Sequence, residues 1–217
     1  RVRIDRETLE PRFKVIGSDL WSDQPGFEES VQATGVTGIC GSGIIEVIAE
    51  MYLAGIISQD GVVDGELAAR SSRIVPMGRT FGYVVYQGAQ TLTVSQNDVR
   101  AIQLAKAALY AGIRLLMDHF GTERIDRIRL AGAFGSHIDV KYAMVLGMIP
   151  DCEVSQVSSA GNAAGTGARI TLLDFGARET SETLVRKVEK VETAVEPTAF
   201  PGRNAASKSA HSINAAR

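Results

Sequence analysis

Three glycine-rich turns of this 217-residue chain contain the residues best suited to binding a ligand. They occupy residues 38–43 (GICGSG), 131–136 (AGAFGS) and 161–167 (GNAAGTG). Each turn precedes a predicted helix, and the second and third directly follow strand-like runs. A glycine turn at a helix start presents unpaired backbone N–H groups and the positive end of the helix, a recurrent way to hold a phosphate. Glycine also lets a ligand approach the backbone closely. The three turns together therefore favour a nucleotide-binding site.

Each turn also has an interpretation without a ligand, as a tight connection that lets a helix pack closely. Phe134 could lie against a flat base or seal the core, and Ser136 could contact phosphate or cap the next helix. Cys40 has no neighbouring histidine to activate it, so we expect a small buried thiol. The candidate ligand-binding residues in the first two turns are Gly38, Gly41, Ser42, Gly43, Gly132, Ala133, Phe134, Gly135 and Ser136.

The elements around the first turn follow from apolar spacing and turn residues. Helical periodicity predicts a helix over residues 44–53, with Ile44, Ile48 and Met51 facing the core, that ends at Gly55. Alternation predicts a hairpin that pairs residues 81–86 with residues 91–94.

The strongest predicted helix begins at Ser95 or Asn97 and ends at Gly121. It is apolar on nearly every side, so we expect most of it to be buried. A polar stripe interrupts it, formed by Arg100, Gln103, Lys106, Tyr110 and Arg114. The stripe is either a solvated face or the lining of a cleft, where Lys106 and Arg100 could meet phosphate or ribose.

The second half of the chain alternates strands and helices. Strands are predicted at residues 125–130 and 154–157, and helices at 141–147, from the third turn to Leu173, and at 178–194. The last helix is amphipathic, with Leu184, Val188 and Val191 inward or against a second chain. This alternation predicts an α/β layered fold, whose ligands bind where helices begin at the carboxyl ends of strands.

Composition narrows the classes of function. A net charge of −2 gives no basic footprint for nucleic acid, and no apolar run approaches the roughly 18 residues of a membrane span. Two cysteines cannot form a disulfide framework, and no metal-ligand cluster is visible. We expect a cytoplasmic protein. The start without methionine indicates a fragment, with residues 1–195 folded and 196–217 a small, polar, flexible tail.

Four sequence runs carry a resemblance to a known family. They are GICGSGIIE (38–46), QNDVRAIQLAKAA (96–108), LAGAFGS (130–136) and GNAA (161–164). Together they resemble the C-terminal ATPase region of reductive activators of corrinoid proteins, over about residues 1–194. The resemblance implies an incomplete ribonuclease H-like α/β lobe of the acetate/sugar kinase–chaperone–actin superfamily, which binds ATP and Mg²⁺ in a cleft.

The resemblance also implies roles for individual positions. Residues 130–136 match the adenosine motif, with Gly132 and Gly135 beside the nucleotide, and residues 161–173 match a connecting helix that hinges the lobes. Gln103 and Lys106 become candidates for contact with the base, and residues 38–43 lie nearby.

The family's redox function is implied in the same way. Its members pass an electron from an N-terminal iron–sulfur cluster, of the 2Fe-2S type, to a cobalt(II) corrinoid, and ATP acts as a conformational fuel. This chain has neither the cluster's cysteines nor the family's two Asp-Ile-Gly-Thr-type phosphate loops, whose acids would hold Mg²⁺. Alone, it is expected to do no redox chemistry and to hydrolyse ATP poorly.

Two other functions stay open. The chain could be a docking module for its partner, a corrinoid protein or corrinoid methyltransferase, with glycine turns kept for packing. It could instead belong with activators of 2-hydroxyacyl-CoA dehydratases, which need a cysteine that bridges two subunits. Neither Cys40 nor Cys152 has surroundings that suggest this. A homodimer is also open.

Overall fold

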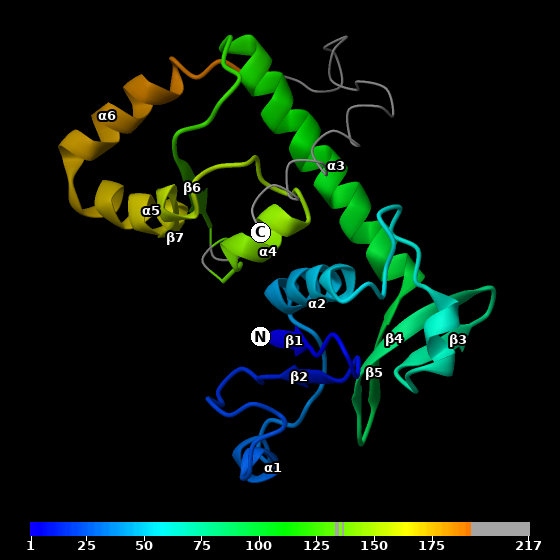
Figure 1. Cartoon of the computed structure of the whole chain (residues 1–217). Coiled ribbons are helices and arrows are strands. Elements are labelled where there is room, and N and C mark those ends of the chain that lie inside the picture. The colour runs from blue at the N-terminus through cyan, green and yellow to red at the C-terminus, as the bar shows by residue number, and fades with distance from the viewer. Residues whose placement is uncertain (133–134, 136, 192–217) are drawn as a thin grey trace. The chain divides into compact units, whose positions relative to one another are not determined.

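The computed structural model describes residues 1–132, 135 and 137–191 (Figure 1). The chain divides into two compact units, one of residues 1–106 and one that begins at Ala107. The first unit contains β1 (Val2–Ile4), β2 (Pro11–Phe13), α1 (Phe27–Ser30), α2 (Gly41–Leu53), the 3-10 helix η1 (Gly65–Ala69), β3 (Ile74–Met77), β4 (Thr80–Gln87), β5 (Thr91–Ser95) and the first half of α3 (Gln96–His119). The second contains the rest of α3, β6 (Ile128–Ala131), α4 (Val140–Val145), the 3-10 helix η2 (Val154–Gln156), β7 (Val157–Gly161), α5 (Ala163–Leu173) and α6 (Phe175–Val185).

Helix α2 forms the centre of the first unit. Every residue from Ile45 to Met51 is buried, and Gly55, with φ 72°, follows the helix end. The predicted helix over 44–53 is therefore confirmed. Burial extends beyond the predicted stripe, because α2 is also covered on the side that carries Glu46 and Glu50.

Two carboxylates of α2 hold the antiparallel β1–β2 pair. Glu46 Oε2 accepts the backbone N–H of Val2 at 3.0 Å, and Glu50 Oε2 accepts that of Ile4 at 3.1 Å. Glu46 also pairs with the guanidinium groups of Arg1 at 2.5 Å and Arg3 at 3.0 Å. Hydrogen bonds and opposite charges thus compensate a carboxylate that is only 2% exposed.

The β3–β4–β5 sheet completes the core of the first unit. Strands β4 and β5 form the predicted hairpin, and β3 pairs antiparallel with β4, an element that was not predicted. Tyr83 of β4 is fully buried, and its hydroxyl donates to the carbonyl of Leu9 at 2.8 Å. This bond holds Leu9 in the left-handed conformation, at φ 61°, in the loop between β1 and β2.

Helix α3 begins and ends as predicted but is not mostly buried. The Ser95 hydroxyl accepts from the Asp98 N–H at 3.3 Å, and the Asp98 carboxylate accepts from the Ser95 N–H at 2.8 Å. This reciprocal cap fixes the first turn, and Gly121 (φ 64°) follows the helix end. Leu104 is 66% exposed, however, and Leu109 and Leu116 are exposed as well. The predicted burial was wrong, because the described elements cover only one side of the helix.

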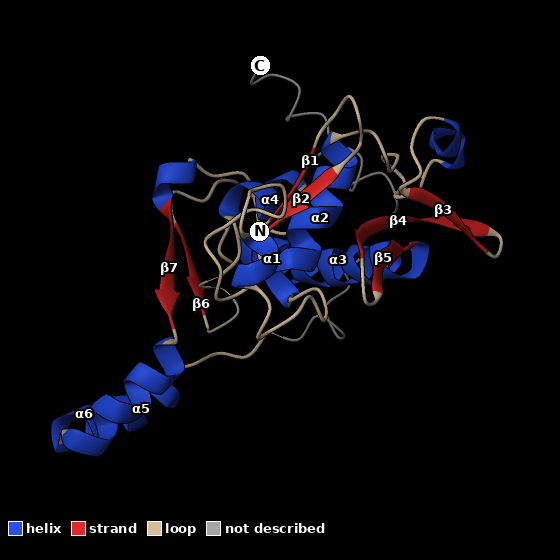
Figure 2. Ribbon diagram, turned by 90° about the horizontal axis from the view of Figure 1, so that it is seen from below, coloured by secondary structure: helices blue, strands red, loops and turns tan. Residues whose placement is uncertain are grey.

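In the second unit, β6 and β7 pair in parallel, and α5 is followed directly by α6 (Figure 2). The strand predicted at 154–157 begins later: residues 154–156 form η2, and β7 follows. Helix α6 ends at Val185, where the sequence predicted a helix to 194. Leu184 and Val188 are 57% and 73% exposed, so their predicted inward orientation was wrong within this unit. Among the described residues, no helix is long and apolar enough to cross a membrane.

Candidate functional site

The second and third glycine turns meet at the carboxyl ends of β6 and β7. The Gly132 N–H donates to the Gly161 carbonyl at 2.8 Å, directly after the last strand pair. Gly132 has φ 111° and Gly161 has φ 60°, conformations that residues with a Cβ rarely adopt. A Cβ placed on either glycine would meet no atom of a described residue within 4 Å. Among these residues the two turns thus leave open space beside partly exposed glycines, which fits close approach by a flat ligand.

We call Gly132, Gly161 and the hydrogen bond between them the glycine junction. The residues that flank it make hydrogen bonds or close contacts with nearby residues in the chain. The Asn162 side chain caps α5 by accepting from the Gly165 N–H at 3.0 Å. Gly135 lies close to β6, since a Cβ there would be 3.3 Å from the Ala131 oxygen. Close packing therefore accounts for Gly135. Three predicted site residues, Ala133, Phe134 and Ser136, lie outside the described residues.

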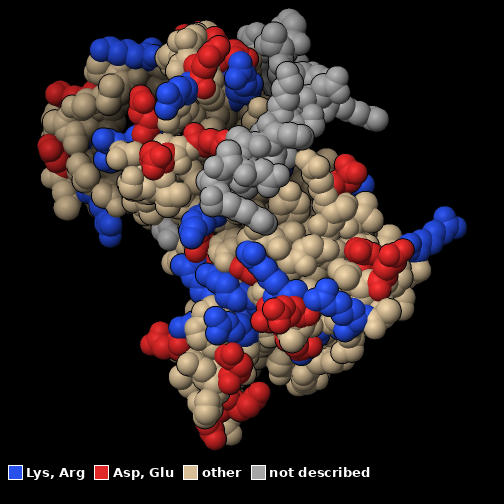
Figure 3. Space-filling model, in the orientation of Figure 1, with Lys and Arg blue, Asp and Glu red and all other residues tan. Residues whose placement is uncertain are grey.

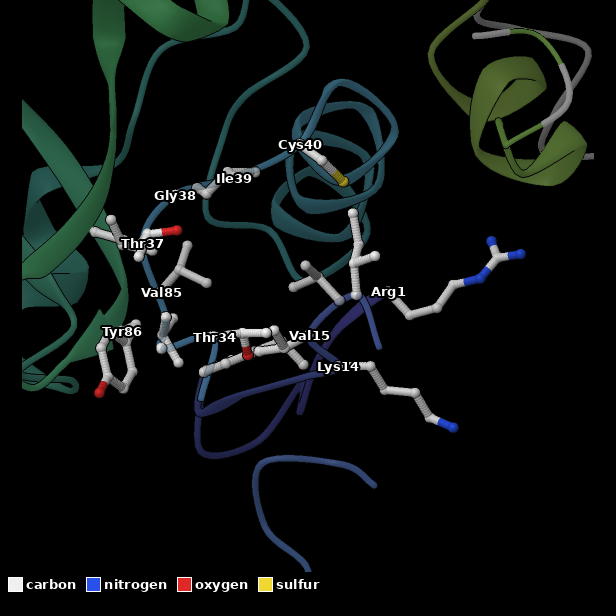
Figure 4. Close-up of a pocket in the computed structure, with 16 residues that line it drawn as sticks. Arg1, Lys14, Val15, Thr34, Thr37, Gly38, Ile39, Cys40, Val85 and Tyr86 are labelled. Atoms are coloured by element: carbon white, nitrogen blue, oxygen red, sulfur yellow. The ribbon is translucent and has the colours of Figure 1, made fainter. Parts of the chain in front are cut away.

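The first glycine turn opens α2 in the first unit. Gly41 and Ser42 begin the helix, and Gly43 is buried against Ile39, whose Cγ2 would lie 3.2 Å from an added Cβ. Gly38 instead lines a cavity of about 400 Å³. Figure 4 shows this cavity between the segment that leads to α2, the β1–β2 hairpin and Val85 and Tyr86 of β4.

Cys40 lies at the rim of the same cavity and is exposed, so its predicted burial was wrong. It occupies the N-cap position of α2 in an extended conformation. Partial burial raises the pKa of the thiol, but the Ser42 hydroxyl and the Gly43 N–H lower it more, and the pKa lies below its ordinary value. The Cys40 thiol is thus expected to react readily with alkylating reagents, and the rate of that reaction can show whether the cavity is occupied.

Gln103 binds a loop of its own unit. Its Nε2 donates to the Asp60 carbonyl at 2.9 Å, and Gln96 donates to the Gly61 carbonyl at 2.6 Å. Gln96 Oε1 also accepts the Val63 N–H at 3.0 Å. The Gln103 Oε1 is buried and accepts no hydrogen bond within the part of the chain that the structure describes. Sequence reasoning missed the contact between Gln96 and Gly61, because the dipeptide Asp60-Gly61 is typical of a turn but does not show which residue the turn contacts.

The rest of the polar stripe divides between two environments. Lys106 is half-buried one turn after Gln103, and burial lowers the pKa of its ammonium group. Arg114 is exposed and pairs with Asp118 at 2.8 Å. Lys106 is the cation of the stripe whose environment favours a ligand role, because a half-buried charge gains most from an anionic partner.

The predicted site residues fall into two groups. Gly38, Gly41–Gly43, Gln103 and Lys106 belong to the first unit, and Gly132 and Gly135 belong to the second. Each group is built independently by its own unit. Over residues 1–132, 135 and 137–191, no three His, Cys, Asp or Glu side chains gather to hold a metal ion. The described residues therefore supply no ready-made ligand set for Mg²⁺ or for an iron–sulfur cluster.

Comparison with known proteins gives three consistent matches. A family described as the C-terminal domain of RACo, the ASKHA domain, matches residues 1–207. The corrinoid activation enzyme RamQ of Eubacterium limosum is 36% identical over 180 residues, which cover 76% of this chain and 30% of RamQ. The solved structure of a reductive activator for corrinoid, iron-sulfur protein superposes with a TM-score of 0.76 at 28% identity, over 92% of this chain and 30% of that one. The chain thus spans less than a third of these relatives.

Proposed function

The chain belongs to the family of the C-terminal ASKHA domain of RACo, and on this basis we propose that it is the ATP-binding C-terminal part of an ATP-dependent reductive activator. Its α/β fold is that of the actin-like ASKHA domain. We propose that residues 1–195 make up this part. Both relatives are named for corrinoid activation, which supports the corrinoid alternative over activation of a 2-hydroxyacyl-CoA dehydratase.

In the complete protein, the proposed reaction transfers one electron from a 2Fe-2S cluster to a cobalt(II) corrinoid, which becomes cobalt(I). The cluster and the phosphate loops would lie in the part of the relatives that this chain does not span. Its partner would be a corrinoid protein or a corrinoid methyltransferase. Low-potential electron transfer fits a reducing compartment, which supports a cytoplasmic setting.

The glycine junction is the observation that supports nucleotide binding most. Parallel strands β6 and β7 end side by side, and the Gly132–Gly161 hydrogen bond leaves two glycines facing open space. In open α/β sheets, ligands bind outside the carboxyl ends of the strands. We propose that Gly132 and its neighbours Ala133, Phe134, Gly135 and Ser136 receive the adenosine part of ATP.

In the first unit, taken by itself, we propose a separate set of candidate nucleotide ligands. Lys106 would meet an anionic or polar group of the nucleotide, since partial burial makes its charge costly. Gln103 would act by holding the loop around Asp60 rather than by direct contact alone. Residues 38–43 would present the N-terminus of α2. ATP binding would shift the equilibrium between conformations of the complete protein and so its affinity for the partner.

Calorimetric titration of the chain with ATP and Mg²⁺ tests this function. We expect saturable heat for the unaltered chain and an affinity at least tenfold lower for Gly132→Ala, whose φ of 111° disfavours a Cβ. Gly167→Ala is the matched control: it lies within α5, where an added Cβ meets no atom within 4 Å. Circular dichroism would check that all three proteins fold.

Two results would contradict the proposal. One is equal ATP affinity for the unaltered chain and Gly132→Ala; the other is no heat from the folded, unaltered chain. Rapid ATP hydrolysis by the chain alone would separately contradict the expectation that the catalytic acids lie elsewhere.

A further inference from the structure

The segment from Val36 to Ile39 runs beside the cavity, and its Val36 carbonyl accepts from Gln90 Nε2 at 3.0 Å. Within the part of the chain that the structure describes, the N–H groups of these four residues donate to no protein acceptor. Thr37 and Gly38 are exposed, and the segment lies outside any helix, strand or turn. Figure 4 shows it running along the cavity from Thr34 to Cys40. An exposed backbone of this kind can pair with an added peptide strand.

The cavity beside this segment is walled mainly by aliphatic side chains. Its volume of about 400 Å³ exceeds that of any single side chain. Ile16 at its edge is 79% exposed, an unusual position for a large apolar residue at a cavity. The aliphatic walls are Val15, Ile16, Val36, Ile39, Val85 and Leu92.

Cations lie at one end of the cavity. Arg1 and Lys14 line it at the end opposite Tyr86 (Figure 4). Arg3 and Arg12, which are register partners, share this face of the β1–β2 hairpin, and Lys and Arg gather over these strands in Figure 3. We call Arg1, Arg3, Arg12 and Lys14 the basic hairpin face.

The carboxylates near this face compensate it only in part. Glu46 pairs with Arg1 and Arg3, and Asp23 lies 3.8 Å from Arg12. Lys14 donates to the backbone carbonyl of Asp19 at 2.6 Å. Among the described residues, no carboxylate lies within 4.0 Å of its ammonium group. The ammonium also lies 5.3 Å from the centre of the Trp21 ring, and the Arg12 guanidinium lies 4.8 Å from it.

We propose that this surface binds an extended segment of a partner protein that carries an apolar side chain flanked by carboxylates. The partner's backbone would pair with residues 36–39, its apolar side chain would enter the cavity, and its acids would meet Lys14 and the rest of the basic hairpin face. This inference rests on the proposed function only in taking the partner to be a corrinoid protein. A nucleotide would use the cations but would leave the aliphatic walls and the row of N–H groups without a role.

Alkylation of Cys40 provides a local test, because the thiol lies at the cavity rim. In the Cys152→Ser variant, iodoacetamide labelling of Cys40 would be followed by mass spectrometry with and without a peptide of sequence Asp-Glu-Leu-Phe-Asp-Glu. We expect at least fivefold slower labelling at saturating peptide, and an affinity that falls as salt is added. The same peptide with lysines in place of the acids should give no protection.

Two variants separate the charged and backbone contributions. Lys14→Glu should lower peptide affinity at least tenfold, whereas Arg79→Glu, an exposed cation of the β3–β4 turn, should leave it unchanged. Thr37→Pro removes an N–H group that makes no bond in the chain, so it should weaken the peptide without unfolding the protein. Retained affinity in both Lys14→Glu and Thr37→Pro would overturn the proposal.

Other outcomes distinguish this proposal from the proposed function. Protection of Cys40 by ATP instead of the peptide would assign the cavity to the nucleotide and overturn the docking surface. Binding of a corrinoid protein that leaves Cys40 labelling unchanged would refute the surface and leave the proposed function intact. Peptide protection without any corrinoid-protein binding would support the surface and contradict the proposed partner.

Discussion

Replacement of Glu46 by glutamine is expected to destabilise the first unit by about 2 kcal/mol. The carboxylate accepts from the Val2 N–H and from two guanidinium groups, and its side chain is only 2% exposed. The amide keeps one acceptor oxygen, but its NH₂ group must then face a donor. A buried donor left without an acceptor costs about 1–3 kcal/mol.

The arginines add little to this cost, because they can turn to water. The Arg1 and Arg3 side chains are 47% and 31% exposed, so water still solvates their charges when residue 46 is neutral. The amide oxygen can stay at the Val2 N–H, so the expected change lies near the middle of the range for one buried donor, the NH₂ group that would replace Oε1. With a urea m-value of about 2 kcal/mol/M, the unfolding midpoint should fall by about 1 M.

Urea unfolding followed by circular dichroism measures this shift, with exposed Glu66→Gln as the matched control. The control should change the free energy of unfolding by less than about 0.5 kcal/mol. Equal midpoints for Glu46→Gln and the unaltered chain would refute the reasoning, since they would show that the carboxylate contributes no net stability.

The same site predicts a dependence on pH. Burial raises the pKa of Glu46, but the Val2 N–H and Arg1 lower it more, and the pKa in the folded chain lies below its ordinary value. The unfolded chain thus binds a proton first as pH falls. The stabilisation is complete above the unfolded pKa, about 4.3, and is lost as pH falls through the folded value. Below about pH 4.3, the difference in midpoint between Glu46→Gln and the unaltered chain should shrink.

Two further substitutions test contacts inside the first unit. Tyr83→Phe should lower the free energy of unfolding by about 1–2 kcal/mol, because the Leu9 carbonyl loses its donor; thermal unfolding measures this, and half-exposed Tyr52→Phe should have little effect. Gly61→Ala should cost about 2 kcal/mol or more, because Gly61 has φ 77° and a Cβ would lie 2.2 Å from Gln103 Nε2. Adding Gln103→Ala should recover part of that loss in urea unfolding; strict additivity of the two changes would show that the residues do not interact.

Local patterns predicted the elements whose signals lie within one stretch of chain. The spacing of Ile48 and Met51 identified α2, and the Ser95 and Asp98 types identified the start of α3. A short strand at the start of the chain was predicted, but its pairing with β2 was not, because each strand has three residues, too few to show alternation. The burial of α3 was overestimated, because apolar residues in a sequence show that a helix face could be buried but not that another element packs on it.

The candidate site was predicted from the types of its residues, and the sequence did not show which of these residues contact one another. Glycine turns at strand ends identified Gly132, and the structure adds that Gly161 is its hydrogen-bond partner. The sequence interpretation counted Gly161 among the glycine turns but left it out of the candidate ligand residues, and so it missed this link. Gln103 was assigned to a ligand, although its nearest partner, the Asp60 carbonyl, lies 43 residues away in the chain. Contacts of that separation depend on tertiary structure and have no local sequence signal.

The carboxylates that hold β1 also protect the hairpin from aggregation. The N–H groups of Val2 and Ile4 lie on the side of β1 away from β2, and an unpaired strand edge of this kind is a template for another chain. Glu46 and Glu50 occupy that edge, and the Ser22 hydroxyl accepts the Phe13 N–H on the far side of β2. Acid that neutralises Glu46 would reopen one edge, so self-association through β1 should accompany the loss of stability at low pH.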